Sequence, residues 1–279
     1  MSKMLEEIRQ QPAALERTFR SELKGVEKLR TLFEKNRPKF IILAARGTSD
    51  NAAQFGRYLL EIATGIPVSL AAPSIFTLYG ARVDYKDALV VAISQSGEST
   101  DTNLVLERAR ECGAFTVGIT NESSSTLAKI AEHVILVRAG REKSVAATKT
   151  YTGQLMAIYM LAYALGAPVS LDELRAMPEA VAGALKLEAE IREMIDRVHG
   201  LGAETLIITD LSNKEAASMK GTRAIVLPSP LHRQSAVPEE LYTPLPYIVP
   251  AQILAACLAE EKGLNPDQPR ALEKVTRTM

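Results

Sequence analysis

Short apolar runs recur along the first half of the chain, and each run ends at polar or turn-forming residues. Runs with such boundaries are typical of strands that are buried on both faces of a parallel sheet. The predicted strands are Phe40–Ala45, Val68–Ala71, Ala88–Ile93, Thr116–Ile119 and Val134–Val137, and the helical segments between them are Asn51–Thr64, Asp101–Glu111 and Ser123–Ala131. Strands that alternate with helices predict an α/β fold, with a three-layer open parallel sheet joined by right-handed crossovers.

The second half of the chain repeats part of this pattern. Gly113–Asn121 aligns with Gly202–Asp210, and Ile135–Val137 is echoed by Ile225–Leu227. Self-similarity of this kind indicates a duplicated unit. Only a helical segment precedes the second copy of the repeat, whereas three strands precede the first. We therefore expect a duplicated sheet whose second copy is truncated and lacks its front half.

These patterns divide the chain into four regions. Residues 1–35 form an N-terminal helical segment, residues 36–168 the first α/β unit, residues 169–199 a linker helix, and residues 200–279 the partial second unit with its C-terminal tail. Helical spacing runs from Ala146 to Leu165 and again from Leu171 to about Val198. The polar segment Leu231–Val237 lies between prolines and is predicted to be a loop.

Composition narrows the possible partners. The chain has 33 basic and 33 acidic side chains and no long run of either sign, which disfavours a nucleic-acid backbone or an anionic membrane as partner. Its 2 cysteines lack C-x-x-C spacing and its 3 histidines are scattered, so a disulfide framework or a zinc cluster is not expected. The start of the sequence lacks the apolar run of a signal peptide, and no apolar stretch reaches membrane-spanning length. We expect a cytoplasmic protein.

Three hydroxyl-rich turns are predicted at one edge of the first sheet. They are Gly47–Ser49 after the first strand, Ser94–Thr100 after the third, and Ser144–Thr150 at the start of the long helix. Any one of them is explained by helix capping alone, since Ser and Thr are common caps. Three turns that converge on one edge favour a phosphate site instead, because helix N-termini and hydroxyl groups bind anions.

Two familiar nucleotide fingerprints are missing from these turns. The sequence contains neither G-x-G-x-x-G nor G-x-x-x-x-G-K-[ST], which disfavours a nicotinamide or nucleoside triphosphate. We expect no cofactor, and a small phosphorylated ligand whose hydroxyl groups are held by Ser, Thr and Gln side chains.

Five ordered motifs resemble a known family. Ala45–Ser49, Ser94–Thr102 and Val145–Lys149 are similar to the motifs of sugar isomerase (SIS) domains, in particular those of the isomerase half of glucosamine-6-phosphate synthase. Glu6–Pro12 resembles the opening of that half, and Asn265–Lys274 resembles its carboxyl tail. The resemblance covers nearly the whole chain and implies a SIS fold, which is flavodoxin-like or Rossmann-like in outline.

The resemblance implies a substrate and a set of site residues. The ligand would be glucosamine 6-phosphate or fructose 6-phosphate. The residues around its phosphate would be Ser94, Gln95, Ser96 and Ser99. The sugar would face Thr48 and the Val145 backbone, with Gly47, Ser49, Ala146 and Thr148 beside them. Lys274 matches the family's tail lysine, which forms a Schiff base with the open-chain ketose. The implied reaction interconverts glucosamine 6-phosphate with fructose 6-phosphate and ammonia, in a homodimer.

The chain departs from the family where the second unit is shortened. The family's proton-shuttling glutamate and ring-opening histidine belong to the missing front half. Three glutamates could stand in for that carboxylate, although each is more simply read as a helix-terminal or surface charge: Glu98, Glu142 and Glu273. His232, in the predicted loop, is a candidate for the ring-opening group, although a histidine in a surface loop is more simply read as a surface residue. The alternative function is a sugar-phosphate binding module that is impaired or inactive as a catalyst.

Overall fold

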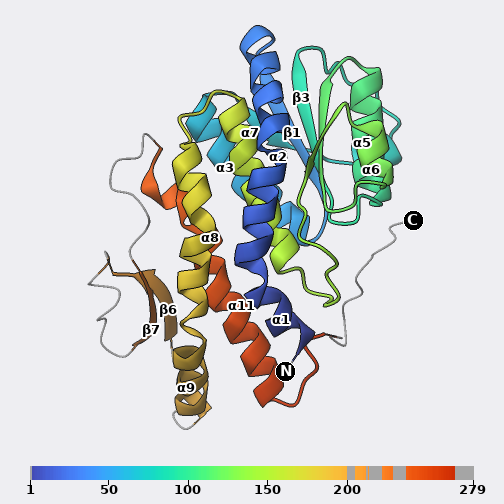
Figure 1. Ribbon diagram of the computed structural model, residues 1–279. Helices are drawn as coiled ribbons and strands as arrows, with labels where there is room; N and C mark the ends of the chain where they lie inside the picture. Colours follow the sequence, from blue (N-terminus) through green and yellow to red (C-terminus); the bar gives the residue numbers. More distant parts are fainter. Residues whose placement is uncertain (1, 200–204, 212, 214–221, 229–236, 268–279) are drawn as a thin grey trace. The chain divides into compact units, whose positions relative to one another are not determined.

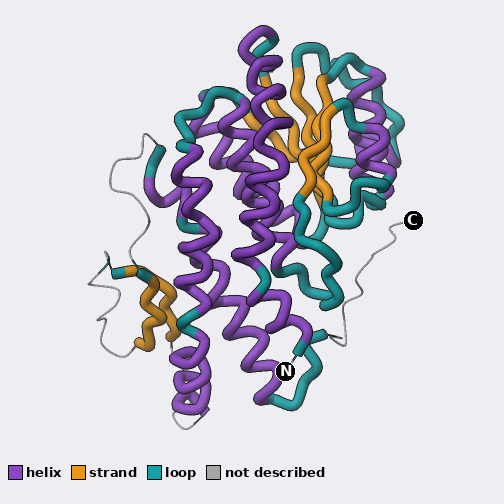
Figure 2. Tube along the Cα trace, viewed as in Figure 1, coloured by secondary structure: helices purple, strands orange, loops and turns teal. Residues whose placement is uncertain are grey.

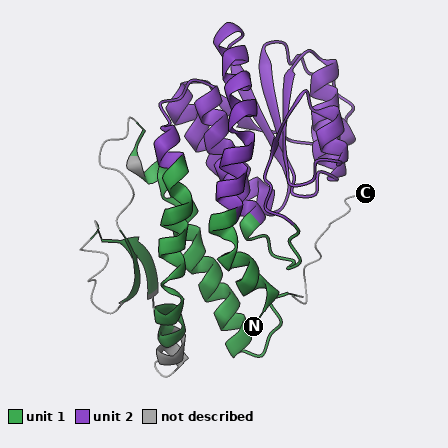
Figure 3. Cartoon of the chain, viewed as in Figure 1, with its two compact units in different colours: residues 1–13, 141–149, 175–274 green, residues 14–140, 150–174, 275–279 purple. Residues whose placement is uncertain are grey.

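The computed structural model describes residues 2–199, 205–211, 213, 222–228 and 237–267 of the chain. The chain divides into two compact units, shown in Figure 3, and each is described by itself. Unit 2 consists of residues 14–140, 150–174 and 275–279, and unit 1 of residues 1–13, 141–149 and 175–274. None of the described helices is both long enough and apolar enough to cross a bilayer.

Unit 2 contains a five-stranded parallel sheet with the strand order β2-β1-β3-β4-β5. The strands are β1 (Phe40–Ala45), β2 (Val68–Leu70), β3 (Ala88–Ile93), β4 (Phe115–Thr120) and β5 (His133–Leu136). Each predicted apolar run is therefore a strand, and the bounds agree to within one residue. All six residues of β3 are buried, which explains why its sequence is uniformly apolar rather than alternating. The sequence thus predicted the α/β class and the parallel sheet correctly.

Helices cover both faces of this sheet, as Figures 1 and 2 show. On one face, α5 (Thr100–Glu111) and α6 (Thr126–Ile130) bury Leu106 and Leu127 in one cluster with Val90 of β3. On the other face lie α3 (Thr48–Thr64) and α7 (Lys149–Ala164), and Gly56 of α3 lets the two helices approach each other over β1. The helix α2 (Gln11–Lys35) also packs on the sheet. Its Phe33 ring lies edge-on to the ring of Phe115 in β4, with the two ring centroids 5.6 Å apart. A short helix, α4 (Ser74–Thr77), follows β2.

Unit 1 combines helices with a second, smaller sheet. Its elements are α1 (Lys3–Arg9), the end of α8 (Leu171–Leu185), α9 (Glu188–His199), β6 (Thr205–Asp210), β7 (Thr222–Leu227), the 3₁₀ turn η1 (Glu239–Tyr242) and α11 (Pro244–Glu261). The strands β6 and β7 are parallel and correspond to the predicted repeats of β4 and β5. The interpretation of this sheet as a truncated second copy stays a prediction.

The helical segment from Leu171 to Val198 is two helices rather than one. The chain turns after Leu185, where the amides of Lys186 and Leu187 bond to the carbonyls of Gly183 and Ala184, three residues back. Such bonds tighten the last turn of a helix and end it. The prediction of one continuous linker helix was wrong, because helical spacing persists across the break while the backbone bonding does not.

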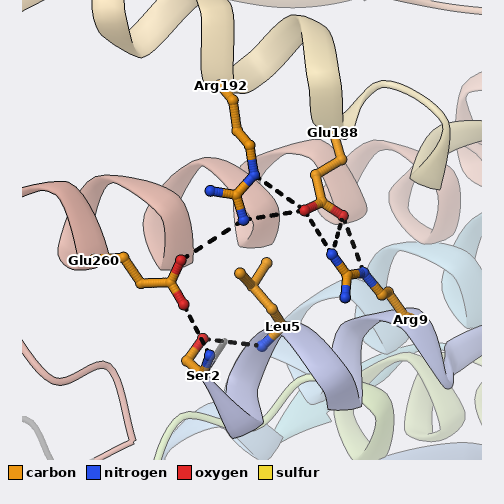
Figure 4. A network of polar contacts seen from close by, with 6 residues as sticks. All are labelled: Ser2, Leu5, Arg9, Glu188, Arg192 and Glu260. Atoms are coloured by element: carbon orange, nitrogen blue, oxygen red, sulfur yellow. Dashed lines mark hydrogen bonds and ion pairs between the residues drawn. The ribbon is translucent and has the colours of Figure 1, made fainter.

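Polar contacts join three helices of unit 1 (Figure 4). The Glu188 carboxylate of α9 accepts hydrogen bonds from Arg9 of α1 at 2.7 Å and from Arg192 of α9 at 3.1 Å. Arg192 also lies 3.6 Å from Glu260 of α11, and Glu260 accepts a bond from the Ser2 amide at 2.8 Å. These side chains are partly exposed, so each ion pair stabilises the fold by at most about 1 kcal/mol. Their main effect is to fix α1 at both ends.

We predict that Gly153→Ala destabilises unit 2. A Cβ at Gly153 of α7 would lie 2.4 Å from Cγ1 of Val137, a buried side chain, and overpacking of this kind costs about 1–3 kcal/mol. Urea unfolding measures the loss. The control is Gly25→Ala in α2, where the nearest atom lies 3.8 Å away and alanine should be neutral or stabilising by up to about 1 kcal/mol. Equal stability of the two variants would contradict the packing of α7 on the strand end.

Candidate functional site

The carboxyl edge of the five-stranded sheet brings two of the predicted turns together. Ala45 of β1 pairs with Ile93 of β3, and Ile93 pairs with Ile119 of β4. The segments that follow these strands therefore begin side by side at one edge of the sheet. In open parallel sheets this edge is where ligands bind. The structure thus places Gly47–Ser49 beside Ser94–Ser99, as the sequence predicted.

The turn between β3 and α5 is shaped by its own hydroxyl groups. The Oγ of Ser94 accepts a hydrogen bond from the Gly97 amide at 3.1 Å, and the Oγ of Ser96 accepts one from the Glu98 amide at 3.3 Å. The Gln95 carbonyl accepts a bond from the Asn121 amide at 3.1 Å, which ties the turn to the segment after β4. Ser94 is buried, whereas Gln95 and Ser96 are half-buried. These hydrogen bonds give the turn a defined backbone shape.

Gly97 is the position in this turn where no other residue fits without strain. Its φ of +67° lies in the left-handed region, and a Cβ there would lie 2.2 Å from the Ser125 Oγ. Its carbonyl accepts hydrogen bonds from the Asn103 side-chain amide and from the Leu127 amide, both at 3.0 Å. The glycine thus holds the turn against α5 and α6 at once. The sequence singled out the hydroxyl groups but did not predict the role of Asn103.

The N-terminus of α5 lies directly after this turn. Ser99 is the N-cap residue, yet its side chain makes no capping bond to the helix backbone. Its Oγ instead lies 2.9 Å from the Thr102 Oγ1. A helix N-terminus carries partial positive charge and favours an anion. The arrangement of the turn and the helix can therefore hold a phosphate.

An ion pair links the first and third strand ends. Arg46, the residue after β1, donates from Nη2 to Oδ2 of Asp101 at 2.9 Å. Asp101 is buried in the first turn of α5, and the Arg46 side chain is 55% exposed. A cation is thereby fixed beside the predicted phosphate turn. The sequence motifs included both residues but did not reveal that they meet, because their pairing depends on the strand order.

In the turn after β1, the three predicted residues have different environments. Gly47 is the N-cap of α3 and has a φ of +60°, and Thr48 is exposed. Ser49 is buried, and its Oγ accepts a hydrogen bond from Gln154 of α7 at 2.9 Å. Thr48 is therefore available to a ligand at the edge, while Ser49 has a partner in the interior.

The third predicted turn belongs to unit 1. Val145 and Ala146 are half-buried, and Thr148 is buried. Thr148 donates to the Glu142 carboxylate from its amide at 2.8 Å and from Oγ1 at 3.1 Å. Glu142 is only 5% exposed, so its interpretation as a surface charge was wrong. Its carboxylate fixes the turn that follows it.

Glu98 has the surface position that the sequence predicted. It is exposed and accepts hydrogen bonds from Thr126 at the start of α6, from the amide at 2.9 Å and from Oγ1 at 2.7 Å. The backbone bond from Thr126 lowers the pKa of the Glu98 carboxyl below its ordinary value, and the hydroxyl bond adds to this effect. A carboxylate held in its charged form in this way is a poor proton donor at neutral pH.

Three further candidates lie outside the described residues. They are Lys274, Glu273 and His232, and their proposed roles stay predictions. Among the residues that the structure describes, no group of three or more His, Cys, Asp or Glu side chains is placed to hold a metal ion.

Comparison with known proteins shows which family model and which proteins the chain resembles. Residues 36–164 match the family model of the SIS domain. The chain is 32% identical to the glutamine–fructose-6-phosphate aminotransferase [isomerizing] of Methanothermobacter thermautotrophicus, and the match covers 97% of this chain and 56% of that protein. The corresponding enzyme of Pyrococcus horikoshii is 33% identical, with 97% and 57% covered. The chain therefore spans little more than half the length of these relatives.

Solved structures share the fold of this chain. A putative phosphosugar isomerase from Silicibacter pomeroyi superposes with a TM-score of 0.77 at 25% identity, covering 96% of this chain and 100% of that chain. The C-terminal domain of glucosamine-fructose-6-phosphate aminotransferase from Francisella tularensis superposes with a TM-score of 0.80 at 22% identity, covering 96% and 98%. The chain thus contains a SIS domain at residues 36–164 and is a homologue of the isomerase half of the glutamine–fructose-6-phosphate aminotransferases.

Proposed function

We propose that this chain binds a phosphorylated amino sugar and interconverts glucosamine 6-phosphate with fructose 6-phosphate and ammonia. The observation that carries the proposal is the turn from Ser94 to Ser99, which has a fixed shape and leads into the N-terminus of α5 within a SIS domain. Homology to the aminotransferases supports a sugar phosphate as the ligand.

In the proposed complex the phosphate lies against the turn between β3 and α5. Ser94, Gln95, Ser96 and Ser99 surround it, and Thr48 contacts the sugar from the turn after β1. The backbone at Val145 and the neighbouring Ala146 and Thr148 contribute further sugar contacts. Little positive charge is needed, because backbone amides and the helix dipole favour an anion at this position.

The proposed chemistry starts at Lys274. Its amine adds to the C2 carbonyl of open-chain fructose 6-phosphate, and water leaves as the imine forms. The imine makes the neighbouring C1–H bond more acidic, so that a carboxylate can move the proton between C1 and C2. Before this proton moves, ammonia adds to C2 and the Lys274 amine leaves, so that the C2 imine carries the nitrogen of ammonia and its isomerisation gives the amino sugar. In the reverse direction Lys274 displaces ammonia from C2, and water then releases fructose 6-phosphate from the lysine.

A second candidate function is binding with impaired catalysis. The alignment with the Methanothermobacter enzyme extends over 338 positions, which exceeds the 279 residues of this chain by 59. At least that many aligned positions are therefore gaps in this chain. The second unit is predicted to lack its front half, and that half would carry the proton-shuttling carboxylate. The gaps favour a chain that retains the phosphate turn and has lost catalytic efficiency.

We predict that replacing Ser94 and Ser96 together with alanine weakens binding of glucosamine 6-phosphate by about tenfold or more. Each hydroxyl accepts a bond that shapes the turn, and a hydrogen bond to a charged group contributes about 1.5–3 kcal/mol. Calorimetric titration measures the affinity. The control is Ser21→Ala combined with Ser69→Ala, two exposed serines of unit 2 that lie outside the predicted turns. Unchanged affinity in a folded Ser94/Ser96 double variant would rule out this placement of the phosphate.

We also predict that borohydride reduction in the presence of fructose 6-phosphate attaches sugar mass to the peptide that carries Lys274. Lys149 should stay unlabelled, because it is 3% exposed and its Nζ donates to Gln10 and to the Arg141 carbonyl, both at 2.8 Å. Mass spectrometry of the digest locates the adduct, and Lys274→Arg should abolish it. An adduct at Lys149 alone, or none in protein that binds the sugar, would refute the assignment.

A further inference from the structure

A buried carboxylate on α1 organises the Arg141–Lys149 segment of unit 1. Glu7 is 4% exposed, and its two carboxylate oxygens accept three hydrogen bonds from this segment. The donors are the Lys143 amide, the Ser144 amide at 3.1 Å and the Ser144 hydroxyl. Three donors that converge on one buried carboxylate define the path of the backbone at these two residues.

The far end of the same segment is held in a similar way. Glu142 accepts from the amide and hydroxyl of Thr148, and Lys149 donates to Gln10 of unit 1. Only residues 145–147 lie between the two carboxylate-bound points, and all three are half-buried. These include the two residues, Val145 and Ala146, that the proposed function assigns to the sugar.

The opposite end of α1 binds the beginning of the carboxyl tail. Asp267 accepts hydrogen bonds from the Lys3 amide at 3.0 Å and from the Met4 amide at 2.9 Å. It lies seven residues before Lys274 in the sequence. Helix α1 is thus bonded to both segments to which the proposed function assigns chemistry in unit 1.

We propose that α1 is a positioning element for the sugar site and that Glu7 is its main positioning residue. Glu7 sets the backbone of residues 145–147, and α1 through Asp267 fixes the start of the tail that carries Lys274. The inference rests on the proposed function. A buried carboxylate is an inefficient way to gain stability, since apolar residues of similar volume often serve as well or better. What the carboxylate provides is one specific arrangement of three donors.

The test is Glu7→Gln, which keeps the side-chain volume but replaces one acceptor oxygen by a donor group. We expect affinity for glucosamine 6-phosphate to fall by about tenfold or more, as for the loss of a charge-assisted hydrogen bond. Affinity for glycerol 3-phosphate, which probes the phosphate turn without a sugar ring, should stay unchanged. Hydrogen exchange at the Lys143 and Ser144 amides should become faster. A merely structural role would lower both affinities together or neither.

Two control variants match Glu7 in different respects. Glu6→Gln changes an exposed carboxylate on the same helix and should alter neither affinity. Glu22→Gln changes a buried carboxylate of unit 2, which accepts from the Leu136 amide at 3.1 Å and should lose stability while retaining sugar affinity. If Glu7→Gln does not fold, Ser144→Ala removes one of the three donors and should still weaken sugar binding selectively.

The outcomes separate this inference from the proposed function. A wild-type chain that binds no glucosamine 6-phosphate would refute the proposed function itself. A wild-type chain that binds, together with a folded Glu7→Gln variant of equal affinity, would overturn only the inference about α1. Asp267→Asn gives an independent result: it should accelerate exchange at the Lys3 and Met4 amides and reduce the trapped adduct at Lys274. An unchanged adduct yield would show that α1 does not position the tail.

Discussion

Burial of the central strands on both faces is the constraint on which the rest of unit 2 depends. Because β3 has no exposed residue, helices must cover both sides of the sheet, and each strand must be connected by a crossover to a parallel neighbour. All strands then end at the same edge, and the segments that follow them meet there. The position of the candidate site is thus a consequence of how the apolar core is buried. The polar residues of the turns add specificity to a position that the core has already fixed.

Carboxylates bonded to backbone amides set the local geometry in both units. Glu142 and Glu7 hold the two ends of one turn, and Asp101 holds Arg46 beside another. Each of these buried carboxylates is satisfied by hydrogen bonds or by an ion pair, as burial of a charge requires. Glu98 and Glu188, which are more exposed, bond instead to the start of a neighbouring helix and to arginines. Each of these interactions fixes the groups that the carboxylate bonds to.

The sequence predicts well those features that depend on local pattern. Apolar runs gave the strands of unit 2 to within one residue, and glycine and hydroxyl residues gave the turns at its carboxyl edge. Features that depend on long-range proximity were missed. The pairing of Arg46 with Asp101 requires β1 and β3 to be neighbours. The burial of Glu142 was missed for a different reason, because it depends on the conformation of its own turn and not on a sequence pattern. The break after Leu185 was also missed, because an amphipathic pattern can continue in phase while the backbone changes direction.

Binding and turnover make different demands on the chain. In the proposed function, binding of a sugar phosphate depends on the turns described above, whereas proton transfer between C1 and C2 depends on a carboxylate within reach of the substrate. The most direct measurement is the rate of fructose 6-phosphate formation from glucosamine 6-phosphate by the wild-type chain, at a substrate concentration that calorimetry shows to be saturating. We expect saturable binding, with turnover about 10² to 10⁴ times slower than in a relative that retains the full second unit. Turnover of about 1 to 10³ per second, as in competent enzymes, would contradict it.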